Sequence, residues 1–220
     1  MGLAIGMVEL NSIARGIETC DYMVKAAQIQ LLRSSTVCPG KYLILIGGET
    51  GDVRASMKEG MLRGGECVVD TLMLPNVHPS LIPAMSGTTQ VPGYGAVGVL
   101  EFFSVASAIT AADVAAKAAN VTLLEVHIGY AIGGKGYVTL TGDVGAVKAA
   151  VEAAGGTFVY VDAKMNPEEY LKAIDNAIAN NASGIVTCIP DQTMSQAVVD
   201  KCKEANMPVV AADDALQDGA

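Results

Sequence analysis

A single cysteine stands where a tight turn would display its thiol. Cys38 is followed by Pro39 and Gly40, and the turn lies between two apolar runs, Ile29–Leu32 and Tyr42–Ile46. Proline has the φ angle that the second position of a β-turn requires, and glycine tolerates the positive φ of a type II turn at the third. Thiolate sulfur is a soft ligand for metal ions. The turn therefore displays one soft ligand, Cys38, which by itself is read as a free turn cysteine; a metal-binding role is the alternative.

A second loop repeats this turn without the cysteine. Residues 131–135 read Ala-Ile-Gly-Gly-Lys and lie between the apolar runs Val121–His127 and Tyr137–Leu140. The segment from Gly129 to Gly136 comes close to the phosphate-binding sequence G-x-x-x-x-G-K-[ST]. However, Gly136 replaces the hydroxyl residue that holds Mg²⁺, and we expect a strand rather than a helix to follow. We therefore reject a nucleotide site and expect the glycines to let neighbouring backbones approach closely.

The two loops belong to a tandem duplication. A shift of ninety-two positions brings twelve residues of the range 4–32 onto identical residues of the range 96–124. Two extra residues in the second loop then change the offset, and Gly40-Lys41 falls on Gly134-Lys135. Self-similarity at a fixed offset indicates two copies of one structural unit.

Each repeat is expected to fold as β-α-β-β-α-β, an α/β (α+β) class with a sheet on one face and two helices on the other. The elements expected in the first repeat are Ala4–Leu10 (strand), a helix from the N-cap Ser12 to Ala27, Ile29–Val37 and Lys41–Ile46 (strands), Asp52–Leu62 (helix), Cys67–Leu74 (strand) and Ser80–Met85 (short helix). The order restarts at Ala96, with Asp143–Ala154 as the second helix and Thr157–Val161 as the closing strand.

The first helix has an apolar face that we expect to be buried. Ile13, Ile17, Met23 and Val24 recur at helical spacing, and the charged residues between them are left for water. Those charged residues are Arg15, Glu18 and Lys25.

Composition narrows the class of protein. The chain has 220 residues, 51% of them hydrophobic, with no Trp and a formal net charge of −9. Nucleic acids and anionic membranes bind basic surfaces, so neither is expected as a partner. We find no nucleophile–base pair, carboxylate dyad or metal cluster within either repeat, and we expect a protein that is not an enzyme. His78 and His127 lack the neighbours of a metal site or triad and are interpreted as structural.

The cysteines and the N-terminus indicate a cytosolic protein. The odd number of cysteines and the lack of a C-x-x-C pair do not fit a disulfide framework or a structural zinc site. Neither a signal peptide nor a membrane span is expected, because Glu9 interrupts the apolar start. Apart from Cys38, we interpret the cysteines as packed small hydrophobes; they are Cys20, Cys67, Cys188 and Cys202.

The repeats resemble the domain of bacterial microcompartment shell proteins. The motifs that carry the likeness are Ala4–Glu9, Met23–Ala27, Val37–Lys41, Leu74–Pro79, His127–Lys135 and Gly142–Val147. Two such domains in one chain are similar to the tandem-domain class, and most of all to the tandem shell protein of propanediol-utilisation compartments. The resemblance implies domains at 1–86 and 96–174 and a linker at 87–95. It also implies a homotrimer that is itself a pseudohexamer and that assembles with other shell proteins into a cytoplasmic microcompartment shell.

The resemblance also implies site residues. Three copies of Cys38 would meet at the trimer axis and hold one 4Fe-4S cluster for electron transfer. The implied pore loops contain Val37, Pro39, Gly40, Lys41, Ile132, Gly133, Gly134 and Lys135. Lys25 and Lys117 would lie at the edge where assemblies meet. Each also follows an aspartate by four residues, which predicts an ordinary helix ion pair.

The C-terminal part departs from the repeats. From residue 155 onward, β and α segments alternate as in a parallel sheet, and this part resembles a fragment of a periplasmic sugar-binding protein of the arabinose type. That likeness implies sugar contacts for Asp213 and Asp214, and a sugar-binding protein is the alternative function. We expect residues 175–220 to form a β-α-β-α-β appendage, with residues 157–174 completing the second domain.

Overall fold

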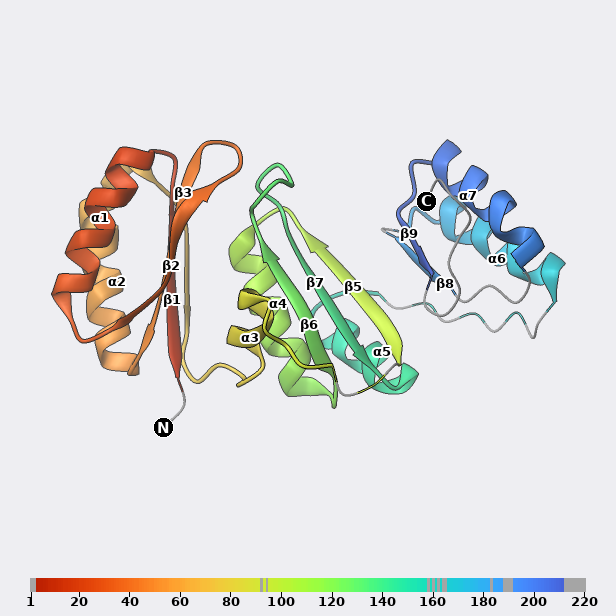
Figure 1. Cartoon of the computed structure of the whole chain (residues 1–220), viewed down its shortest axis with the longest axis horizontal. Helices are drawn as coiled ribbons and strands as arrows, with labels where there is room; N and C mark the ends of the chain where they lie inside the picture. The colour runs from red at the N-terminus through yellow and green to blue at the C-terminus, as the bar shows by residue number, and fades with distance from the viewer. Residues whose placement is uncertain are drawn as a thin grey trace.

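The computed structural model describes residues 3–211, apart from residues 92, 94, 158, 160, 162, 164, 165, 183 and 188–191. Figure 1 shows three successive units along the chain, each with its own sheet. The predicted order of elements in the first repeat is confirmed, and the second repeat follows the same order through its second helix. Among the described residues, no helix is long and apolar enough to cross a membrane.

The first unit is a four-stranded antiparallel sheet with the strand order β2-β3-β1-β4. Its elements are β1 (Ala4–Leu10), α1 (Ile13–Ala26), β2 (Gln30–Val37), β3 (Lys41–Gly48), α2 (Thr50–Gly64), η1 (Gly65–Cys67), β4 (Val68–Leu74) and α3 (Leu81–Ser86). All seven residues of the central strand β1 are buried. Helices α1 and α2 cover one face of this sheet (Figure 1).

The second unit repeats the same plan with three described strands in the order β5-β7-β6. Its elements are β5 (Ala96–Phe102), α4 (Val105–Ala118), β6 (Thr122–Ile128), β7 (Gly136–Gly142) and α5 (Val144–Ala153). The predicted closing strand Thr157–Val161 is wrong for its described residues Thr157, Val159 and Val161, which lie in no strand. Local β propensity predicts a strand there, but strand formation depends on pairing with a neighbour.

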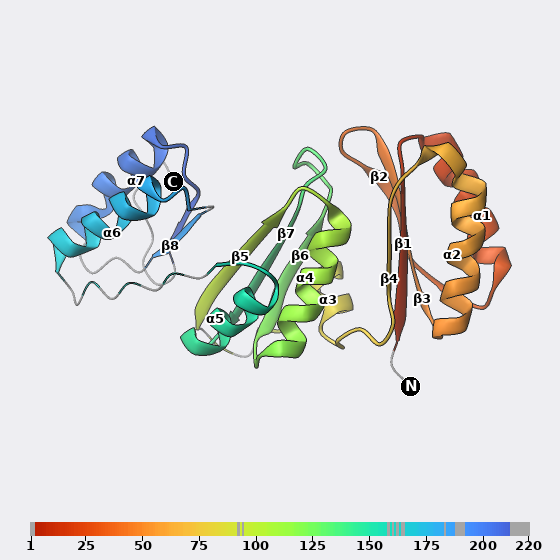
Figure 2. The same ribbon diagram turned by 180° about the vertical axis from the view of Figure 1, so that it is seen from behind.

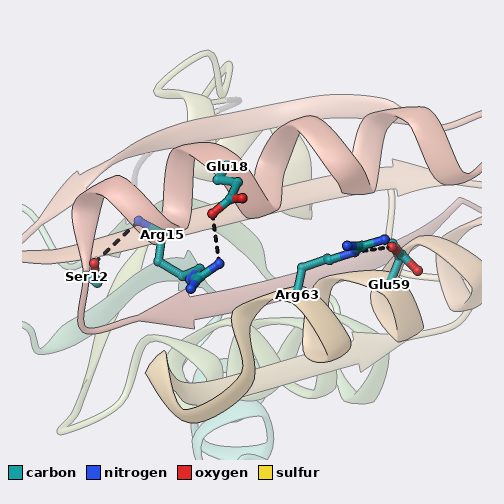
Figure 3. Close-up of polar contacts among 5 residues, drawn as sticks. All are labelled: Ser12, Arg15, Glu18, Glu59 and Arg63. Atoms are coloured by element: carbon teal, nitrogen blue, oxygen red, sulfur yellow. Dashed lines mark hydrogen bonds and ion pairs between the residues drawn. The ribbon is translucent and has the colours of Figure 1, made fainter.

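Helix α1 begins where the sequence predicts, but its buried face differs from the prediction. The Ser12 side chain accepts a hydrogen bond from the Arg15 backbone N–H at 3.4 Å and so caps the helix (Figure 3). The buried positions are Gly16, Thr19, Cys20 and Met23. In contrast, Ile13, Ile17 and Val24 are exposed and form a second apolar stripe beside the buried one. The expectation that these three residues are buried is therefore wrong for the single chain, in which all three are exposed to solvent.

The two units share one core. Helix α4 lies between its own sheet and the uncovered face of the first sheet (Figures 1 and 2). One cluster accordingly joins Met7 and Leu43 of the first unit to Val105 and Ile109 of α4 and to Leu140 of the second sheet. This double packing explains why α4 is rich in alanine and buries residues around most of its circumference.

The C-terminal unit has a separate core. Its elements are α6 (Pro167–Ala179), β8 (Ile185–Thr187), η2 (Gln192–Met194), α7 (Ser195–Glu204) and β9 (Val209–Ala211). Strands β8 and β9 pair in parallel, as the alternation of β and α segments predicts. The buried cluster contains Tyr170, Ile174, Met194, Val198 and Cys202.

Candidate pore-loop site

The two predicted pore loops lie against each other within one chain. The Cys38 backbone N–H donates to the Gly129 carbonyl oxygen at 2.9 Å. A Cβ atom on Gly134 would lie 2.6 Å from the Cys38 carbonyl oxygen, which is closer than real Cβ contacts. Gly134 also has a φ of +85°. Only glycine fits this position without displacing a neighbour. The close approach of the two loops therefore explains why residue 134 is a glycine.

The turn around Cys38 has the positive φ predicted for its glycine, and Cys38 lies at its entrance. Gly40 has a φ of +77°, as the turn requires, and the peptide bond between Cys38 and Pro39 is cis. Val37 is buried, whereas Cys38 is half-buried and Pro39 and Gly40 are exposed. The Cys38 thiol is in no disulfide.

Each pore-loop lysine is held by a glutamate at the end of the first strand of its unit. Lys41 pairs with Glu9 at 2.7 Å, and Lys135 pairs with Glu101. The pairs occupy equivalent positions of the repeat but differ in burial. The Glu9 side chain is 3% exposed and lies on the face of β1 that carries Met7 into the core shared with the second unit, whereas the Glu101 side chain is 48% exposed. The sequence analysis missed both glutamates, although the repeat aligns them as it aligns the lysines.

The second loop is tied to strand β6 by His127. Its Nε2 donates to the Tyr130 carbonyl oxygen at 2.6 Å, and its Nδ1 lies 2.8 Å from Glu125 Oε1. The ring also stacks on Tyr137, whose hydroxyl donates to Glu125. Burial, together with that hydrogen bond, raises the pKa of Tyr137. His127 therefore has the structural role that the sequence predicts.

The remaining pore-loop residues also follow the prediction of a tight, glycine-rich turn. Ile132 accepts a hydrogen bond from the Lys135 N–H through its carbonyl oxygen, and Gly133 has a φ of +65° with open space around it. Gly133 and Gly134 both need positive φ, but only Gly134 lies against the first loop.

The lysines predicted at the assembly edge form the expected helix pairs. Lys25 binds Asp21 and Lys117 binds Asp113, both at 2.6 Å. Asp21 is exposed, but Asp113 is buried and also accepts the His78 backbone N–H of the first unit at 2.7 Å. Asp113 therefore joins the two units. An edge role for the lysines stays a prediction.

The other cysteines are only partly as predicted. Cys20 on α1 and Cys202 on α7 are buried, and burial raises the pKa of the Cys202 thiol. Cys67 lies in η1 rather than in a strand, but it packs partly buried against the core of the first unit, as a packed small hydrophobe does. Cys188 lies outside the described residues, as do Asp213 and Asp214, so the predicted sugar contacts remain predictions.

Comparisons with known proteins identify the family. The family described as BMC domain matches residues 4–77 and 96–166. The chain is a tandem BMC-domain protein. It is 47% identical over 175 residues to the bacterial microcompartment shell protein PduT of Citrobacter freundii, covering 77% of this chain and 95% of that protein. It is also 34% identical over 88 residues to the carboxysome shell protein CsoS1 of Prochlorococcus marinus, covering 39% of this chain and 85% of that protein.

A solved structure agrees with this assignment. A microcompartment protein from Desulfitobacterium hafniense superposes with a TM-score of 0.67 at 49% sequence identity, covering 70% of this chain and 86% of that one. The predicted fold class of two tandem microcompartment domains is confirmed. The relatives are named as shell proteins, which confirms a structural protein rather than an enzyme.

Within this tandem BMC-domain protein, the site has a limited set of metal ligands. No group of three or more His, Cys, Asp or Glu side chains able to hold a metal occurs in the described part of the chain. One chain offers the single thiol of Cys38 at the loop tip. A site with several thiolates would therefore draw ligands from several chains.

Proposed function

We propose that the chain is a structural subunit of a bacterial microcompartment shell and that three copies close a six-lobed ring around a central pore. Within one chain, the first unit packs against helix α4 of the second unit. In the ring, the second unit of one chain packs in the same way against helix α1 of the first unit of the next chain. A heterologous contact whose rotation closes produces such a ring.

One observation carries this proposal, namely the unequal burial of equivalent helix positions. Ile17 on α1 is 57% exposed, whereas its counterpart Ile109 on α4 is fully buried. Ile13 and Val24 are exposed in the same way, whereas the residues ninety-two positions later, Val105 and Ala116, are buried. Since α4 is covered by the first unit of its own chain, α1 presents a matching surface for the second unit of another chain. Burying one such isoleucine contributes about 1.5–3 kcal/mol.

The paired glutamates and lysines support the same closure. The buried pair of Glu9 and Lys41 lies at the junction within the chain, and the equivalent pair of Glu101 and Lys135 is exposed. In a closed ring the second pair would be covered by a neighbouring chain as the first pair is covered here. Both pore loops would then repeat around the axis.

Sedimentation of the wild-type chain beside an Ile17→Glu variant tests the ring. We expect a trimer for the wild type and a monomer for the variant, because a carboxylate buried without a partner opposes association. Leu62→Glu, a matched change at an exposed leucine of α2, should remain trimeric. A wild-type monomer, or a trimer of Ile17→Glu, would contradict the proposal.

The pore of this ring would bring three copies of Cys38 together. Three soft thiolates suit an iron–sulfur cluster, and they supply three of the four cysteine ligands that a 4Fe-4S cluster ordinarily takes. Cys38 fits this role because it lies half-buried at a loop tip with its thiol in no disulfide. When bound, the cluster would supply one-electron transfer across the shell, while the loop residues hold the thiols in place.

Anaerobic assay of iron and sulfide tests the cluster. We expect about one 4Fe-4S cluster per three chains in the wild type and none in Cys38→Ser, since serine removes the soft ligand. Cys67→Ser, a change at another half-buried cysteine, should keep the cluster. Equal cluster content in wild type and Cys38→Ser would show that Cys38 is not a ligand. The oligomeric state of Cys38→Ser, measured in parallel, should stay unchanged.

The setting proposed for this trimer is the cytoplasmic shell of a propanediol-utilisation compartment. Lys25 and Lys117 would meet neighbouring assemblies at the rim, with other shell proteins as partners. The likeness to PduT along most of the chain supports this setting.

A further inference from the structure

A cavity of about 370 Å³ lies between the two units of the chain. The first unit contributes Arg33 of β2, together with Met85 of α3 and Thr89 after it, and the second unit contributes Leu124 and Glu125 of β6. Its volume falls within the range of small-molecule sites. The walls combine apolar side chains with a few polar groups, as such sites do.

Most of the polar and charged side chains around this cavity already have hydrogen-bond partners within the chain. Glu125 contacts His127 Nδ1 and accepts from the Tyr137 hydroxyl, and His127 Nε2 is bound to the Tyr130 carbonyl oxygen. Arg33 is different, because its Nε donates to Ser35 Oγ at 3.0 Å while no described carboxylate forms an ion pair with it. The two terminal nitrogens of the guanidinium therefore retain donors for an oxyanion.

A second polar group in the wall also lacks a partner. Thr89 Oγ1 is buried, and no described residue forms a hydrogen bond with it. A buried hydroxyl without a hydrogen-bond partner destabilises the protein. A ligand with its own hydroxyl group would satisfy Thr89 while its charged end binds Arg33.

We propose that this cavity binds a small hydroxy monocarboxylate. The carboxylate binds the Arg33 guanidinium, the hydroxyl binds Thr89, and the short carbon chain lies against Met85 and Leu124. A carboxylate is favoured over a phosphate dianion because Glu125 already places a negative charge in the same wall. The site lies within one chain and does not depend on ring closure.

Titration calorimetry with 3-hydroxybutyrate as the probe tests the site. We expect saturable binding to the full-length chain that weakens at least tenfold in Arg33→Gln, because glutamine lacks the charge and the fork of donors. Arg54→Gln removes the same charge from the exposed face of α2 and should bind like the wild type. Equal binding by Arg33→Gln and Arg54→Gln, or no binding by the wild type, would overturn the proposal.

Three further titrations separate the parts of the proposal. The neutral amide 3-hydroxybutyramide and inorganic phosphate should each bind at least tenfold more weakly than 3-hydroxybutyrate. Thr89→Val should weaken 3-hydroxybutyrate binding severalfold and leave butyrate binding unchanged. Tight binding of the amide or of phosphate would refute recognition of a monocarboxylate by Arg33. Ile17→Glu should bind the probe like the wild type, so failure of ring closure is distinguishable from failure of this site.

Discussion

At the scale of single residues, the pore-loop pair depends on one backbone hydrogen bond and on a glycine that permits close approach. Gly134 lets the second loop approach the backbone of Cys38, and the Cys38 N–H donates to the Gly129 carbonyl oxygen. Both contacts use backbone atoms. The position of the Cys38 thiol is thus fixed by the path of two loops.

Replacing Gly134 with alanine should destabilise this pair of loops. The new Cβ would lie 2.6 Å from the Cys38 carbonyl oxygen, and alanine is strained at a φ of +85°. Urea denaturation should show a loss of about 1–3 kcal/mol in the free energy of unfolding. Gly133→Ala is the matched control, because Gly133 has positive φ but open space around it, and it should lose less. Equal losses would mean that contact with Cys38 contributes nothing.

At the scale of elements, helices α1 and α4 show what the sequence predicts and what it leaves open. The spacing of Ile13, Ile17 and Val24 correctly predicts an apolar stripe on a helix. Periodicity does not say which neighbour covers the stripe. The sequence analysis assigned it to the core of the first unit, but the adjacent stripe around Gly16 and Met23 occupies that place. The surface that we propose to cover the exposed stripe follows from α4, whose equivalent positions are buried between two sheets.

The same comparison makes a prediction about the two helix aspartates. Asp113→Ala should cost about 2 kcal/mol in the free energy of unfolding, because it leaves the His78 N–H and Lys117 without their partner. Asp21→Ala should cost about 0.5 kcal/mol or less, since an exposed ion pair contributes little.

This difference is best measured by urea denaturation in the Ile17→Glu background, where the chain is expected to be monomeric. Equal losses from the two substitutions would show that Asp113 does not stabilise the junction between the units.

At the scale of the whole molecule, the duplication and the order of elements could be predicted from the sequence, because repeated glycines, lysines and apolar runs mark them directly. The two loops could be predicted as turns, but their contact with each other depends on how the units pack. The buried Glu9 and its partner Lys41 were missed for the same reason, since Glu9 lies on the face of β1 that packs into the core shared with the second unit. The closing strand of the second unit was predicted from local β propensity, and its described residues form no strand.

A crystal structure of the assembled protein tests the central claim most directly. The result that we predict is a threefold ring in which Ile17 is buried against the second unit of a neighbouring chain, as Ile109 is buried within one chain, and in which three Cys38 thiols face the axis. An assembly that leaves Ile17 exposed to solvent, or that places Cys38 away from the axis, would contradict the account.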